Sequence, residues 1–148
     1  ATLSEAIEVA QGHTGLRIDL KAADLQDPIG RCLGAAGFRE AMICGGYLDT
    51  LEHLKADLPH VAVSLTPDPA FYRSLAQELP RLPFLDALTV YWRTVGPHMA
   101  QAVQAQGVAL LAWTVDYPHV ARKVLEAGAD GITSNNLELL LDLPRRTP

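Results

Sequence analysis

The chain has 148 residues, of which 49% are hydrophobic and 20% charged, and this size and composition are typical of one globular domain rather than a disordered segment. Twelve basic against seventeen acidic residues give a formal net charge of -5, and no run of Lys or Arg offers a surface for nucleic acid. No apolar stretch approaches the roughly 18 to 20 residues of a membrane span, so we expect a soluble protein, with the cytoplasm favoured over the periplasm.

The chain opens on a helix start signal. Thr2 and Glu5 have the spacing of a capping box, in which each side chain accepts a hydrogen bond from the other residue's backbone amide. Glycines at positions 12 and 15 then predict the end of this helix. The following segment, LRIDLK at 16–21, alternates apolar and polar residues and is typical of a strand.

Beyond residue 21 the pattern alternates between short apolar strands and amphipathic helices of about 10 to 12 residues, which indicates parallel strands joined by crossover helices. The nearly continuous apolar character of several strands suits a sheet covered on both faces. Either a doubly wound open sheet or a section of a (β/α)8 barrel fits about six such strands. The expected helices lie at about 27–37, 47–59, 69–80, 97–107 and 118–128 and the expected strands at 41–46, 61–66, 86–92, 108–115 and 130–134, with a closing helix after the last strand.

Asp19 and Lys21 are the first candidates for a functional site. Two residues apart on a strand, they project from one face about 6.5 Å apart, at the carboxyl end where parallel α/β folds place their sites. The carboxylate could hold a hard cation and the ammonium a phosphate oxygen, although these residues by themselves favour a solvated ion pair on an edge strand. Trp113 ends another apolar strand, either as a flat ring at the mouth of the fold or as an ordinary core aromatic.

Other motif classes are missing from the sequence. The five histidines show no pair at metal-ligand spacing and are expected on the surface, and Cys32 and Cys44 are expected to be buried free thiols. Neither a glycine-rich nucleotide loop nor a Gly-x-Ser-x-Gly elbow is present, which argues against dinucleotide, nucleotide and serine-hydrolase functions.

Three segments in order resemble one family. LLAWTVDYPHVARKVLEAGADGITSNN at 110–136 is similar to the closing strand, helix and strand of the glycerophosphodiester phosphodiesterases. TLSEAIEVA followed by LRIDLK resembles a helix and strand in the middle of the same barrels, and MICGGYLDTLEHLKADLPHVAVSLT resembles the strand, helix and strand that come next. The resemblance implies an incomplete TIM-type (β/α) barrel, with residues 1–148 forming a single domain that lacks the first strands.

The resemblance also implies roles for three residues. Asp19 falls on an acidic ligand to a divalent cation, Mg²⁺ or Ca²⁺, where the family usually has Glu; Lys21 falls on a lysine near the phosphate; Trp113 falls on an aromatic of the substrate pocket. The family's His pair and further acidic ligands, which belong to the first two strands, are absent, so no catalytic residue is identified. Because Ca²⁺ or Mg²⁺ takes about six oxygen ligands, one aspartate is an incomplete set.

Three functional hypotheses follow. The resemblance implies a metal-dependent enzyme of lipid metabolism that hydrolyses glycerophosphodiesters to glycerol 3-phosphate and an alcohol, with this chain alone expected to be inactive. The alternative is a noncatalytic or truncated barrel module that binds a partner or oligomerises, and a third is a section of an unrelated α/β enzyme. About six strands cannot close an eight-stranded barrel, so an upstream segment or a second copy is expected to cover the open edges.

Overall fold

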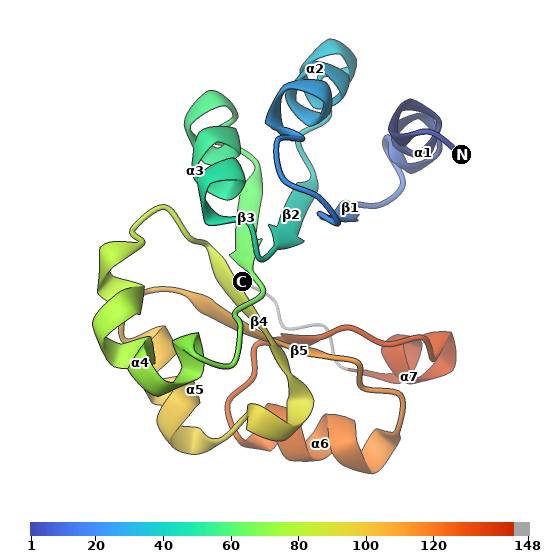
Figure 1. The fold of residues 1–148 in the computed structure, drawn as a ribbon. Helices are drawn as coiled ribbons and strands as arrows, with labels where there is room; N and C mark the ends of the chain where they lie inside the picture. The colour runs from blue at the N-terminus through green and yellow to red at the C-terminus, as the bar shows by residue number, and fades with distance from the viewer. Residues whose placement is uncertain (144–148) are drawn as a thin grey trace. The chain divides into compact units, whose positions relative to one another are not determined.

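The computed structural model describes residues 1–143, in which parallel strands alternate with helices along the chain (Figure 1). The described strands follow chain order from β1 to β6. A doubly wound sheet reverses its strand order at a switch point, and no reversal occurs here, so that alternative is wrong. The architecture is that of an incomplete TIM-type (β/α) barrel, as predicted.

The element bounds agree with the expected segments, apart from strands that end earlier than their apolar character suggested. The strands are β1 (Leu16–Asp19), β2 (Ala41–Gly45), β3 (Ala62–Leu65), β4 (Ala87–Tyr91), β5 (Ala109–Trp113) and β6 (Gly131–Ile132). The α-helices are α1 (Leu3–Ala10), α2 (Gln26–Ala36), α3 (Leu48–Asp57), α4 (Phe71–Glu78), α5 (Pro97–Gln104), α6 (Pro118–Glu126) and α7 (Leu137–Asp142), with 3-10 turns η1 (Leu79–Arg81) and η2 (Trp92–Thr94).

Two compact units make up the chain, one over Ala1–Leu88 and the other beginning at Thr89. In the first unit β1 pairs with β2, β2 with β3, and β3 with the first two residues of β4, all in parallel. The predicted capping box is present at α1, where the Thr2 amide donates to Glu5 at 2.7 Å. This local bond begins the helix at Leu3, as the sequence predicted.

In the second unit β5 pairs in parallel with β6, and helices α5, α6 and α7 alternate with these strands. An apolar cluster joins the strands to α6 and α7, and Trp92, Val95 and Ile132 pack against it. Its buried members are Ala112, Val115, Val120, Ala121, Val124, Ala129 and Leu139. Helix α6 therefore turns its apolar stripe toward the sheet, as the 3.6-residue period of its sequence predicts.

An aspartate stands immediately before β4 and another before β6, and each one ties its strand to the neighbouring strand of its unit. The Asp86 carboxylate accepts a hydrogen bond from the Val63 amide at 2.7 Å and pairs with the Lys55 ammonium at 2.8 Å. The Asp130 carboxylate accepts from the Leu110 amide at 2.9 Å. Because a charged acceptor strengthens such a bond, these aspartates stabilise the amino ends of the strands.

Candidate functional site

Asp19 and Lys21 are brought together at the carboxyl end of β1. Asp19 is the last residue of the strand, and its carboxylate pairs with the Lys21 ammonium just beyond the strand end. Buried Leu20 separates them, so the predicted alternation continues past the strand. Both side chains are exposed, and the hydrogen bond from Lys21 to Asp19 raises the pKa of the lysine. Lys21 is thus a fixed positive charge at neutral pH.

The chain around this pair is held by the carboxyl end of β2 and by Tyr47, which follows that strand. The Leu20 amide donates to the Cys44 carbonyl at 2.7 Å, and the Tyr47 hydroxyl donates to the Lys21 carbonyl at 3.1 Å. A Cβ atom at Gly45 would lie 2.8 Å from the Leu20 Cβ, so only glycine permits this approach. These contacts fix the backbone at Leu20, between the two residues, and at Lys21.

The described residues do not fit a divalent cation by themselves. Within residues 1–143, no three His, Cys, Asp or Glu side chains come together as a metal-binding group. The Asp19 carboxylate is already paired with an ammonium, and one carboxylate supplies too few of the roughly six oxygens that Mg²⁺ or Ca²⁺ takes.

Trp113 is the last residue of β5 and is 39% exposed, so it is not the ordinary core aromatic that the sequence also allowed. Tyr91, the last residue of β4, lies beside it with 5.7 Å between the ring centroids and is 38% exposed. Two partly exposed aromatic rings therefore stand at the carboxyl ends of neighbouring strands of the second unit, where barrel folds bind their ligands.

The residues after Tyr91 extend this aromatic surface. The sequence placed Trp92 inside the strand, but the strand ends at Tyr91 and Trp92 begins the turn η2. The Arg93 guanidinium lies over the Trp92 ring at 4.9 Å from the centroid and over the Tyr91 ring at 5.9 Å. Sequence reasoning missed Tyr91 and Arg93, although two adjacent aromatics and an arginine after an apolar strand were a visible signal.

Asp116 organises the loops next to Trp113. Its carboxylate accepts hydrogen bonds from the Asn135 amide at 2.7 Å and from the Ser134 hydroxyl at 3.0 Å. The bonds from Asn135, first the backbone and then the side chain, lower the pKa of Asp116 below its ordinary value, and Ser134 lowers it further. Asn136 caps α7 through its side chain, which accepts from the Leu139 amide. The loop after β5 and the loop after β6 are therefore joined by one anionic side chain.

The histidines and cysteines contribute no candidate site. All five histidines are exposed, as expected. Both cysteines are free, and Cys44 is buried as expected, whereas Cys32 on α2 is only partly buried and lies 3.7 Å from the exposed Ser4 hydroxyl.

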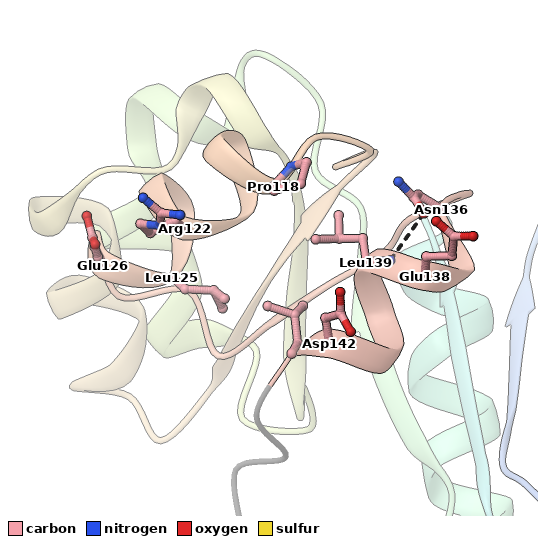
Figure 2. A pocket seen from close by; sticks show the side chains of 9 residues that line it. Pro118, Arg122, Leu125, Glu126, Asn136, Glu138, Leu139 and Asp142 are labelled. Carbon is pink, nitrogen blue, oxygen red and sulfur yellow. Dashed lines mark hydrogen bonds between the residues drawn. The ribbon is translucent and has the colours of Figure 1, made fainter.

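A separate groove of about 450 Å³ runs between α6 and α7. Figure 2 shows Leu125 and Leu139 lining it together with charged side chains such as Arg122, Glu126 and Asp142. The groove follows the two helices, whereas Trp113 stands at the end of a strand. It is therefore a helix surface distinct from the strand-end candidates.

Comparison with known proteins decides the family. The family model for the glycerophosphoryl diester phosphodiesterase family matches residues 7–139. The chain belongs to this family. A search of curated proteins found no significant match. The hypothesis of an unrelated α/β enzyme is therefore wrong, and the family that the sequence resembled is confirmed.

Solved structures share the fold at low sequence identity. A putative glycerophosphoryl diester phosphodiesterase from Silicibacter pomeroyi is 19% identical with a TM-score of 0.80, over 95% of this chain and 56% of that one. The glycerophosphodiester phosphodiesterase from Thermotoga maritima is 16% identical with a TM-score of 0.79, over 97% and 64%. A phosphodiesterase from Oleispira antarctica, solved with its product sn-glycerol-3-phosphate, is 22% identical with a TM-score of 0.69, over 90% and 56%. The chain thus spans less than two thirds of each of these structures.

Among the described helices, none combines the length and apolar character needed to cross a membrane.

Proposed function

We infer that a complete barrel containing this sequence is a metal-dependent phosphodiesterase that hydrolyses glycerophosphodiesters to glycerol 3-phosphate and an alcohol. The observation that carries this proposal is the family match over residues 7–139, together with the barrel-type alternation of strands and helices. The substrate is then a small molecule with a phosphodiester at its centre. Hydrolysis of this kind needs a base that takes the proton from the attacking hydroxyl as its oxygen bonds to phosphorus, and an acid that protonates the alcohol oxygen as its bond to phosphorus breaks.

In this proposal Lys21 neutralises a phosphate oxygen, because its ammonium is exposed at a strand end and carries a raised pKa. Asp19 would supply one oxygen ligand to a Mg²⁺ or Ca²⁺ ion, and because residues 1–143 hold no complete ligand set, further oxygens would have to come from water or from other residues. A bound cation of this kind withdraws charge from the phosphodiester. Trp113 presents a flat apolar surface to the substrate.

A noncatalytic role is the second candidate, and a specific observation favours it. Residues 1–143 contain no three-residue group of metal ligands. As a truncated module, the chain would use the open edges of β1 and β6 to bind an upstream segment or a second copy. Light scattering of the purified chain tests the homo-oligomer directly.

The deciding experiment is hydrolysis of glycerophosphocholine by this chain and by the longest product of its gene, with Mg²⁺, with Ca²⁺ and with EDTA. Cation-dependent release of glycerol 3-phosphate by the longer product supports the enzyme. No hydrolysis by either protein would leave the noncatalytic module as the better account.

Variants then test the site. Asp19→Asn should weaken activation by the cation, and Lys21→Ala should raise KM or lower kcat, both with little change in stability because the two side chains are exposed. A matched exposed pair on α4 and η1, Glu78 and Arg81, provides the controls Glu78→Gln and Arg81→Ala. Unchanged kinetics in both Asp19 and Lys21 variants would reject these roles.

A further inference from the structure

The aromatic surface at the ends of β4 and β5 has features that the proposed hydrolysis does not itself require. Tyr91 and Trp113 are each more than one third exposed, although large aromatic side chains gain most when they are covered. Trp92, by contrast, packs against the apolar cluster of the second unit and anchors the turn η2. The exposed rings of Tyr91 and Trp113 therefore lie next to a turn that Trp92 packs against the core of the second unit.

The backbone of this turn is held in place. The Thr94 hydroxyl donates to the Tyr91 carbonyl at 2.7 Å, and the Val95 amide donates to the Trp92 carbonyl at 3.3 Å. These bonds enclose Arg93, whose guanidinium rests against the rings of Tyr91 and Trp92. A cation held against aromatic faces in this way is already oriented before a ligand arrives.

Arg93 brings a positive charge to this surface. Within residues 1–143 no carboxylate forms an ion pair with Arg93. Asp116, which follows Trp113 by three residues, keeps its negative charge, but its carboxylate is directed to Ser134 and Asn135, from which it accepts hydrogen bonds. A ligand at the aromatic pair therefore meets an unneutralised guanidinium.

We propose that Tyr91, Trp113 and Arg93 form the subsite for the alcohol group of the phosphodiester, and that this subsite selects an uncharged polyhydroxy alcohol over an ammonium alcohol. The proposal rests on the phosphodiesterase function inferred above. The C–H groups of a polyol are attracted to the electron-rich ring faces, while its hydroxyl oxygens accept hydrogen bonds from the guanidinium, which has five N–H donors and no acceptor.

An ammonium alcohol such as choline is also attracted to aromatic faces, so the guanidinium decides between the two classes. Arg93 already lies against the Tyr91 ring, and a second positive charge beside it is repelled. A polyol meets no such repulsion and gains the donors of Arg93. The preference should amount to about tenfold, the order expected for one screened pair of like charges at a protein surface.

The test is a fluorescence titration of the full chain, because its two tryptophans, Trp92 and Trp113, both belong to this surface. The probes are glycerophosphoglycerol and glycerophosphocholine, which share the glycerol phosphodiester and differ in the alcohol. We expect the emission to change at about tenfold lower concentration of the polyol diester. Equal or tighter binding of the choline diester, or no response to either probe, would overturn the proposal.

Charge reversal makes the test sharper. Arg93→Glu should invert the preference in favour of the choline diester, and Tyr91→Leu should weaken the response to both probes. Lys123→Glu is the matched control, because it makes the same change in net charge at an exposed position of α6 and should leave the preference unchanged. The same preference in Arg93→Glu and in the unaltered chain would reject the role of Arg93.

The subsite and the phosphodiesterase activity can be refuted independently of each other. Hydrolysis of glycerophosphocholine at a kcat/KM equal to or above that of glycerophosphoglycerol would refute the subsite and leave the phosphodiesterase intact. Selective binding of the polyol diester without hydrolysis by any longer product would refute the phosphodiesterase and leave the subsite.

Discussion

Replacing Asp86 by alanine should destabilise the first unit more than the loss of a surface ion pair would. The carboxylate accepts from the Val63 amide at 2.7 Å, and both of its oxygens bind the Lys55 ammonium, at 2.8 and 3.0 Å. Lys55 is also fixed by a bond of 3.1 Å to the Val61 carbonyl, so little side-chain entropy is recovered when its partner is lost.

The expected loss of unfolding free energy depends on how exposed the Asp86 and Lys55 side chains are. The Asp86 side chain is 40% exposed and that of Lys55 22%, so the ion pair itself contributes only about 0.5 to 1 kcal/mol. The charge-assisted bond to a strand amide adds about 1.5 to 3 kcal/mol. Asp86→Ala should therefore lower the free energy of unfolding by about 2 to 4 kcal/mol. Lys55→Met preserves the bond to Val63 and should cost at most about 1 kcal/mol.

Urea unfolding followed by far-UV circular dichroism measures this difference. With a slope of about 2 kcal/mol per molar urea, Asp86→Ala should shift the midpoint down by about 1 to 2 M. The control is Glu78→Ala, because Glu78 pairs with Arg81 at 3.4 Å on the surface and should cost about 0.5 kcal/mol or less. Equal shifts for Asp86→Ala and Glu78→Ala would refute the reasoning.

Three further predictions concern single positions elsewhere in the chain. Gly128→Ala should destabilise the second unit by about 1 to 3 kcal/mol, seen as a lower Tm, because φ is +105° there and the new Cβ would lie 2.6 Å from the Ala100 Cβ. Asp116 has a lowered pKa when folded, so its stabilising contribution is present above its ordinary pKa of 3.8 and is lost as the pH falls through the lower folded value. Unfolding midpoints measured between pH 3 and pH 6 should therefore decline less in Asp116→Asn than in the unaltered chain, and parallel curves would contradict this. Thr2→Ala should cost about 0.5 to 2 kcal/mol at the start of α1, measured as faster amide exchange in that helix, whereas Thr14→Ala outside the capping box should leave this exchange unchanged.

The sequence by itself determined the local structure and the family. Helix and strand periods, and the Thr2–Glu5 capping box, arise from residues a few positions apart, so they can be read before the chain is folded. The alternation of strands and helices and the ordered family segments then indicated an incomplete barrel. The same reasoning placed Asp19 and Lys21 side by side, because two residues apart on a strand share a face.

Only the tertiary structure decided which distant residues meet. Asp86 reaches Lys55 across 31 positions, and Asp116 reaches Asn135 across 19. The exposed pair of Tyr91 and Trp113 depends on where two strands end and on their lying next to each other, which periodicity does not encode. Local preference describes one segment at a time, whereas a site at the ends of parallel strands is assembled by sheet pairing, and this is why Arg93 and its aromatic neighbours emerged only from the fold.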